Sequence, residues 1–324
     1  MIERAEELAE RLFPDRTAKK RMLVIVNPYA TTVSDRLKHL VVYALQSRYA
    51  VEAVDTESRD HATEICREAA AEGYDVVVAF GGDGTVNEAA NGLVGSDTPL
   101  TVLPGGSTNV FCRTLGIPRD VVDATEHLLR IADEFQPRRI DLGRANERHF
   151  VFASGIGLDA SVVERVDRRP RLKARAGEWY FTWAALSTFA RRYLVHPPRV
   201  RVEAAGRTVE GVTAIIQNAD PFTYFGSRPI RIAEGADLEG GTLSLAVLKR
   251  ATAIDVPTLL PRIFSADAAR LQRHRQIEGF RNLREARVVS LGDEGFPLQV
   301  DGDHVGSFDE VRYGVVPGAL AVVA

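Results

Sequence analysis

The chain has 324 residues, enough for about two domains, with 45% hydrophobic and 26% charged residues. This ordinary balance excludes wholesale disorder, and a net charge of −3 argues against general nucleic-acid binding. Because about 18 apolar residues never run together, a membrane-spanning helix is not expected. Met1–Phe13 alternates acidic and apolar residues, which predicts a surface helix and not a signal peptide. Cys66 and Cys112 lack metal-ligand spacing, so we expect packed thiols, kept reduced in a cytoplasmic chain.

The first part of the chain, residues 1–135, alternates predicted strands with predicted helices. The β-branched run at residues 76–78 is typical of a parallel strand buried on both faces. Strands separated by helices indicate βαβ units and a parallel sheet. The expected strands are Leu23–Val26, Tyr49–Val54, Asp75–Phe80 and Leu100–Leu103, and the expected helices are Ser34–Tyr49, His61–Ala71 and Val86–Ala90.

The second part, residues 136–309, is dominated by predicted strands that glycine and proline punctuate, and the changeover lies near residues 136–139. This pattern indicates a largely antiparallel β-domain after the α/β domain, so the predicted fold class is α/β plus β. The expected helices are Pro170–Tyr193 and Ile254–Phe264, and the expected strands are His149–Ala153, Arg199–Ala204, Val209–Gln217, Thr242–Leu248, Ala286–Leu291 and Leu298–Val300.

A first glycine loop, Gly81-Gly82-Asp83-Gly84-Thr85, lies between a predicted strand and a predicted helix. Glycines permit positive φ and a close approach of the backbone, and the amides at a helix N-terminus favour phosphate. This arrangement predicts an anion site. Thr85 and Glu88 also match the Thr-x-x-Glu capping box, which competes with a functional role for Glu88.

A second loop, Pro104-Gly105-Gly106-Ser107-Thr108-Asn109, follows the next predicted strand. Successive parallel strands usually lie side by side, so both loops should meet at the carboxyl edge of one sheet, where α/β proteins bind ligands. Either loop alone could be a tight turn. Two loops that both precede helices favour a cradle for a polyphosphate.

Asp83 stands among amides that would bind phosphate, where a carboxylate is unfavourable unless a cation or a proton offsets its charge. We therefore expect Asp83 to hold magnesium or to accept a proton. The alternative is an aspartate that only helps the Asp-Gly turn. The P-loop pattern is absent, and Gly-x-Gly-x-x-Gly does not occur in the first βα turn, which argues against a standard dinucleotide fold.

Taken together, these blocks resemble the diacylglycerol kinase catalytic family, which includes bacterial lipid kinases and sphingosine kinases. The matching blocks, which follow one another in the family's order along most of the chain, are Asn27-Pro28, residues 81–93 (GGDGTVNEAANGL), residues 103–109 (LPGGSTN), residues 155–160 (GIGLDA) and residues 299–303 (QVDGD). The central block is fairly specific alone, and the ordered set is highly specific.

The resemblance implies an N-terminal α/β domain that binds ATP and a β-sandwich domain that binds the lipid, with the two substrates meeting between them. It further implies that residues 310–324 return to the first domain. The nucleotide contacts that it implies are Asn27, Thr31, Thr56, Gly81, Gly82, Asp83, Gly84, Thr85, Asn87, Gly105, Gly106, Ser107 and Thr108.

Three blocks depart from the family pattern. The first loop reads NPYAT, with Thr31 where the family usually has glycine, which predicts a stiffer loop or a different ATP pose. Asp303 replaces the glutamate that is the proposed general base of bacterial members, so the carboxylate is kept but loses one methylene. The segment that corresponds to the family's magnesium-binding Asp-Asp-Gly reads Asp237-Leu238-Glu239-Gly240, in which Glu239 is the candidate metal ligand.

Two aspartates have a simpler explanation beside the functional one. Asp301-Gly302 is a strong hairpin signal, and a rigid turn there would also position Asp303 for catalysis. Asp159 follows a Gly-x-Gly turn; the resemblance to sphingosine kinases suggests contact with the lipid head group, whereas the sequence alone allows a turn-capping aspartate.

Residues 165–207 are locally basic and contain both tryptophans, Trp179 and Trp183. One interpretation is a helix that meets an anionic membrane, and the alternative is an aromatic core stripe with a solvated basic face. Within this segment Arg175 is the best candidate for a contact with an ATP phosphate.

The sequence therefore predicts an ATP- and magnesium-dependent kinase that phosphorylates a hydroxyl of a membrane lipid, with Asp83 and Asp303 as catalytic residues. Diacylglycerol, giving phosphatidic acid, is the first expectation. A kinase of sphingoid bases or other lipid alcohols, a kinase of NAD or another metabolite, and a non-catalytic nucleotide or lipid sensor are the alternatives. The expected partners are the lipid and a transient anionic membrane surface, with no nucleic acid and with a homodimer as one option. We expect a cytoplasmic chain that associates peripherally with membranes.

Overall fold

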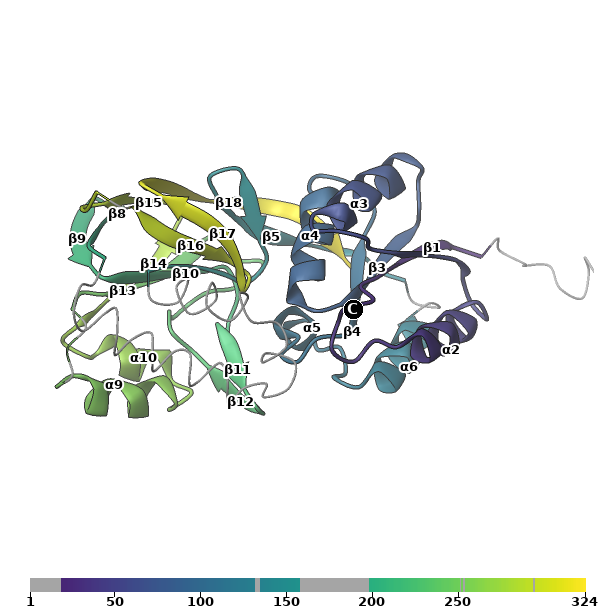
Figure 1. Ribbon diagram of the computed structural model, residues 1–324, viewed down its shortest axis with the longest axis horizontal. Helices are drawn as coiled ribbons and strands as arrows, with labels where there is room; N and C mark the ends of the chain where they lie inside the picture. The colour runs from purple at the N-terminus through teal and green to yellow at the C-terminus, as the bar shows by residue number, and fades with distance from the viewer. Residues whose placement is uncertain (1–18, 132–134, 158–197, 251, 253, 294) are drawn as a thin grey trace, which may run out of the picture.

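The computed structural model describes residues 19–131, 135–157, 198–250, 252, 254–293 and 295–324. The expected helices at Met1–Phe13 and Pro170–Tyr193 lie outside these residues. The described chain forms two parts, an α/β part and a β-rich part, which one long strand connects (Figure 1). The predicted fold class is thereby confirmed.

Four parallel strands form the centre of the α/β part, in the order β2-β1-β3-β4. Helices α3 and α4 pack together on one side of the sheet, and α2 and α6 pack together on the other (Figure 1). The elements are β1 (Arg21–Val26), α2 (Asp35–Leu45), β2 (Ala50–Asp55), α3 (His61–Ala71), β3 (Val76–Gly81), α4 (Asp83–Leu93), β4 (Leu100–Pro104), α5 (Val110–Thr114) and α6 (Val121–Ile131).

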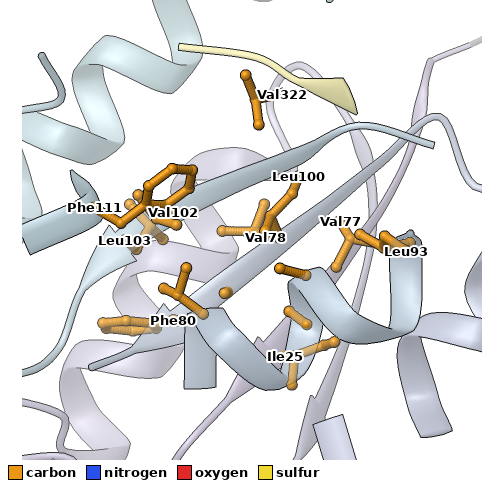
Figure 2. Close-up of a cluster of buried hydrophobic side chains, with 14 of the residues drawn as sticks. Ile25, Val77, Val78, Phe80, Leu93, Leu100, Val102, Leu103, Phe111 and Val322 are labelled. Atoms are coloured by element: carbon orange, nitrogen blue, oxygen red, sulfur yellow. The ribbon is translucent and has the colours of Figure 1, made fainter. Parts of the chain in front are cut away.

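The core of this part is continuous because helices cover both faces of the sheet. Every residue of β3 is buried, as the run of valines predicted. Figure 2 shows Val78 and Phe80 of β3 packed among Leu100 and Phe111 of neighbouring elements. Cys66 and Cys112 are free, buried thiols, which confirms the prediction, and burial raises the pKa of each to about 12.

The β-rich part is a sandwich of two sheets. One is fully antiparallel, in the order β14-β13-β10-β7-β16-β17, and the other contains β5, β6, β8, β9, β15 and β18. Phe150, Val202, Val300 and Tyr313 from the two sheets share one core. The strands are β5 (Arg138–Ala145), β6 (Arg148–Phe150), β7 (Ala153–Ile156), β8 (Val200–Ala204), β9 (Arg207–Gly211), β10 (Thr213–Gln217), β13 (Leu243–Leu248), β14 (Ile277–Leu283), β15 (Glu285–Ser290), β16 (Phe296–Val300), β17 (Asp303–Phe308) and β18 (Glu310–Val322).

Smaller elements extend from this sandwich. Strands β11 (Thr223–Phe225) and β12 (Arg228–Ile230) form a separate hairpin, and helices α9 (Val256–Ile263) and α10 (Ala268–Gln272) lie between β13 and β14 in the chain. All four lie along one edge of the molecule, the lower edge in Figure 1.

Two of the expected strands are wrong as single elements. The segment at His149–Ala153 is divided between β6 and β7, because the amides of residues 151–153 turn toward the carboxylate of Asp301. The segment at Val209–Gln217 is divided between β9 and β10, which belong to different sheets.

The last strand, β18, ties the two parts together. Near its start Val311 pairs with Val288 of β15, and at its end Val322 pairs in parallel with Leu100 of β4. Figure 2 shows Val322 beside Leu100 in the α/β core. The strand therefore contributes side chains to the cores of both parts.

We predict that Leu320→Ala lowers the free energy of unfolding by about 2–5 kcal/mol, because Leu320 is fully buried where β18 enters the α/β core. Val122→Ala is the control, since the Val122 side chain is 66% exposed on α6 and its loss should cost less than about 0.5 kcal/mol. Denaturant titration measures both. Equal stability of the two variants would contradict a core role for β18.

Candidate active site

The two glycine loops lie side by side at the carboxyl ends of β3 and β4, as predicted. Gly81 pairs with Pro104 in the sheet, and the Gly105 amide donates to the Gly81 carbonyl at 2.7 Å. A Cβ on Gly105 would lie 2.8 Å from Gly81 Cα, and a Cβ on Gly106 would lie 2.9 Å from Gly82 Cα. The loops thus touch backbone to backbone, which only glycine permits.

The loop after β1 completes this edge. The Asn27 side chain donates to Thr85 Oγ1 at 3.1 Å, and the Thr32 amide donates to the Gly105 carbonyl at 3.1 Å. Thr56 follows β2 and is buried, and its amide donates to the Val26 carbonyl at 2.8 Å. Thr31 is exposed on the same loop as Asn27. Segments after β1, β2, β3 and β4 therefore converge on one edge of the sheet.

Helix α4 begins earlier than the sequence predicted. Its N-cap is Gly82 and its first residue is Asp83, so Thr85 lies inside the helix and the Thr85–Glu88 capping box is wrong. Glu88 instead accepts from the Ala62 amide of α3 at 3.3 Å. Gly82 has no side chain, so the N-cap residue makes no side-chain hydrogen bond to the N-terminal amides of α4. Such a terminus attracts anions.

Asp83 points toward the beginning of α5. Its carboxylate oxygens accept from the amides of Val110 and Phe111, at 3.1 and 3.2 Å. Burial raises the pKa of Asp83 to about 6, the two amides oppose this rise, and the charge of Asp303 adds to it. Since the charge of Asp303 repels that of Asp83, binding of a cation or a proton at this point is favourable.

Asp303 reaches the same place from the β-rich part. The turn Asp301-Gly302, with φ of 47° and 86°, joins β16 to β17 and pairs Val300 with Asp303, as the hairpin signal predicted. The Asp303 carboxylate lies 2.7 Å from where a Cβ on Gly84 would be. Gly84 therefore makes room for Asp303 in the first turn of α4.

The Asp301 carboxylate holds this turn in place. It accepts from three consecutive amides, those of Val151, Phe152 and Ala153, at 2.6, 2.9 and 3.0 Å. It also accepts from the side chain of Asn87 at 2.8 Å. Burial raises the pKa of Asp301 to about 6, and these four donors oppose the rise by favouring the charged form.

Asn87, a predicted nucleotide contact, has its side chain engaged within the protein. Asn87 is completely buried, and its amide donates to the His149 carbonyl at 2.9 Å as well as to Asp301. Its oxygen accepts from Arg148 at 2.9 Å, and Arg148 also pairs with Asp60 at 2.9 Å. Asn87 therefore joins α4 to the β-rich part.

Of the other predicted site residues, three lie in the described chain and two lie outside it. Asp159 and Arg175 lie outside the described residues. Glu239 forms an ion pair with Arg138, and the described residues contain no group of three or more side chains suited to hold a metal. Ser107 is exposed and Thr108 is partly buried in the second glycine loop.

Of the described arginines in the basic segment, Arg199 and Arg201 pair with Glu210, and Arg207 pairs with Glu278.

Sequence reasoning did not identify Arg148 or the anchoring role of Asp301. The Asp-Gly pair indicated a turn, but the three amides that fix it come from about 150 positions earlier in the chain. No local signal in the sequence connects these segments.

Comparisons with known proteins agree with this geometry. The profile of the diacylglycerol kinase catalytic domain matches residues 21–145, and that of the YegS C-terminal NAD kinase beta sandwich-like domain matches residues 153–324. The chain is 28% identical to a diacylglycerol kinase of Bacillus subtilis over 296 residues, which cover 89% of this chain and 91% of that protein. It is 25% identical to a diacylglycerol kinase of Staphylococcus aureus over 294 residues, covering 89% of this chain and 87% of that protein.

A crystal structure of a diacylglycerol kinase from Bacillus anthracis has the same fold, with a TM-score of 0.67 at 21% identity over 95% of this chain and 98% of that one. The chain belongs to the diacylglycerol kinase catalytic-domain family, with the YegS-type second domain. It is therefore a kinase of the lipid kinase class, and membership of this family implies the use of ATP. None of the described helices is long and apolar enough to span a membrane.

We predict that Gly105→Ala weakens ATP binding by at least roughly tenfold, because the new methyl group would push apart the two glycine loops. Gly292→Ala is the matched control, since a Cβ there meets nothing within 4 Å. Calorimetric titration with a non-hydrolysable ATP analogue measures both affinities. If the two variants bind the analogue equally well, the contact between the loops does not shape the nucleotide site.

Proposed function

We propose that this protein transfers the γ-phosphate of ATP to a primary hydroxyl of a membrane lipid, and that diacylglycerol is the lipid, giving phosphatidic acid. The observation that carries the proposal is the Asp303 carboxylate at Gly84, in the first turn of α4 and beside Asp83. This arrangement brings an acidic group of the β-rich part to a phosphate-type site of the α/β part. The names of the similar proteins support the choice of lipid.

The glycine loops would hold the nucleotide. Amides of residues 81–84 and 105–106, together with the N-terminus of α4, would surround the phosphates and stabilise the charge that is transferred. We further propose contacts from Asn27, Thr31, Thr56, Thr85, Ser107, Thr108 and Arg175.

Asp83 is the proposed ligand for magnesium. The fit rests on two neighbouring carboxylates, those of Asp83 and Asp303, whose repulsion helps to raise the pKa of Asp83. When bound, the cation would neutralise charge on the transferring phosphate. Glu239 lies in an ion pair with Arg138, so a cation there would have to compete with the guanidinium.

Asp303 is the proposed general base. It would accept the proton of the lipid hydroxyl while the hydroxyl oxygen forms a bond to the γ-phosphorus and ADP leaves. Its attachment to a turn fixed by four hydrogen bonds to Asp301 limits its movement and would hold its carboxylate in a defined position.

The direct test incubates the protein with labelled ATP, magnesium and mixed micelles that contain diacylglycerol, a sphingoid base or another lipid alcohol, with soluble NAD as a further acceptor. Chromatography separates the products. Labelled phosphatidic acid is expected. Labelled NADP would favour the metabolite kinase, and binding of ATP without any product would favour the sensor.

Asp303→Asn should lower kcat by roughly 10²- to 10⁴-fold with little change in the KM for ATP, because the variant keeps the shape of the side chain but cannot take a proton. Asp83→Ala should abolish transfer while the protein stays folded. Asp293→Asn, at an exposed position, is the control. Turnover by Asp83→Ala at the wild-type rate would refute the assignment.

We also predict that kcat/KM falls as the pH drops through about 6, the pKa to which burial and Asp303 raise Asp83. The sign follows because protonation removes the charge on which cation binding depends. Since magnesium favours the ionised carboxylate, higher magnesium should move the midpoint to lower pH. Rate profiles at two magnesium concentrations measure this, and a midpoint that ignores magnesium would contradict it.

A further inference from the structure

Helix α9 has an apolar face that is exposed instead of buried. Leu259 packs into a small core with Ile230 and Leu271, which accounts for one face of the helix. On another face, at helical spacing, Pro257, Leu260, Pro261 and Phe264 are exposed, and Ile254 precedes them. Ile254 is 80% exposed, Leu260 44% and Phe264 40%. A surface helix of a globular protein normally presents polar residues to water.

The segment that contains this apolar face carries an excess of basic residues. Residues 249–275 contain six basic and two acidic side chains, a local excess of four in a chain whose net charge is −3. Arg270 and Arg273 are both exposed, and with Arg262, Pro261 and Ser265 they line an open hollow between α9 and α10. Exposed apolar residues beside arginines are the pattern of a helix that lies on an anionic bilayer.

The acidic residues near this surface are already paired. Asp255 binds Arg275 at 2.8 Å, and Asp267 caps α10 through the amides of Ala269 and Arg270. On the neighbouring strand β14, Glu278 pairs with Arg207 at 2.9 Å. Asp267 also lies 3.7 Å from Arg270 in an exposed pair, which offsets part of the charge of that arginine, whereas Arg262 and Arg273 form no ion pair with a described residue.

This surface is connected to the candidate active site by packed side chains. Phe264 at the end of α9 meets Phe225 of β11, with ring centroids 5.7 Å apart. The preceding residue, Tyr224, stacks under Arg113 of α5, whose guanidinium carbon lies 3.2 Å from the ring centroid, and Arg113 also donates to the Gly226 carbonyl at 3.1 Å. Helix α5 begins at the amides that Asp83 binds. The hairpin β11–β12 thus lies between α9 and α5 (Figure 1).

We infer that α9 and α10 form a docking surface for an anionic lipid bilayer, in which Ile254, Leu260 and Phe264 enter the interface while Arg270 and Arg273 contact lipid phosphates. The inference rests on the proposed function in its choice of occupant, because a kinase of membrane lipids must meet its acceptor at a bilayer. Docking at α9 places the β11–β12 hairpin, which lies along the same edge of the molecule, toward the same membrane (Figure 1).

The test compares two pairs of variants by flotation with vesicles of phosphatidylcholine alone or with phosphatidylglycerol. Ile254→Ser/Leu260→Ser removes apolar contact, and its control is Leu40→Ser/Tyr43→Ser on α2, where the side chains are 57% and 78% exposed. Arg270→Gln/Arg273→Gln removes charge, and its control is Arg36→Gln/Arg130→Gln in the α/β part. Circular dichroism and thermal unfolding check that each variant is folded.

We expect the wild type to bind vesicles that contain phosphatidylglycerol and to lose binding as salt is raised. Each arginine should contribute roughly fivefold, corresponding to about 1 kcal/mol, so the double arginine variant should bind about 25-fold more weakly. The apolar variant should lose at least roughly tenfold. Both control variants should bind like the wild type. Binding by either α9–α10 variant at the wild-type level overturns the inference.

Activity separates this inference from the proposed function. With a short-chain, monomeric diacylglycerol the α9–α10 variants should match the wild type, and with vesicle-embedded diacylglycerol they should be slower. If the wild type phosphorylates no lipid yet floats with anionic vesicles through α9, the proposed function fails and the docking surface stands. If light scattering shows a dimer that the Ile254→Ser/Leu260→Ser variant dissociates, the face is a contact between copies and the inference fails.

Discussion

The buried carboxylate of Asp301 and its four donors set the relation between the two parts of this protein. A charged group out of contact with water is tolerable only when its hydrogen bonds are complete, and here three successive amides and Asn87 complete them. Asn87 belongs to α4, so the hydrogen bonds to Asp301 that fix the hairpin also fix the position of this helix, which begins in the first glycine loop. The same hydrogen bonds set the position of Asp303, which lies two residues after Asp301 in the hairpin.

The fixed positions of α4 and the hairpin determine which backbone segments and which carboxylates meet at the carboxyl edge of the sheet. The glycines remove every Cβ that would separate the two loops or exclude Asp303. Two carboxylates and one helix N-terminus are thereby held close together, an arrangement that raises the pKa of Asp83 and suits a cation with a polyphosphate. Burial and the charge of Asp303 raise the pKa of Asp83, whereas the amides at the start of α5 oppose this rise.

The two parts also share a sheet and a surface. Strand β18 is built into both cores, which couples their stability. The hairpin β11–β12 carries a second connection, from Phe264 on α9 through Tyr224 to Arg113 on α5. A bilayer that binds α9 would accordingly lie near the β11–β12 hairpin. This hairpin packs against α5, the helix whose first amides donate to Asp83.

The sequence by itself determined the alternation of strands and helices in the first part, the buried β3 strand, the two glycine loops and the Asp301-Gly302 hairpin. These are local properties, set by residue type, spacing and the φ values that glycine allows. Only the tertiary structure decided that the buried Asn87 connects α4 to the β-rich part, that α4 begins at Asp83, and that Asp303 lies at Gly84. Each of these depends on partners far away in the chain, such as His149, Arg148 and residues 151–153. Hydrogen bonds between such segments leave no periodicity in the sequence, because they are selected by the packing of the whole fold.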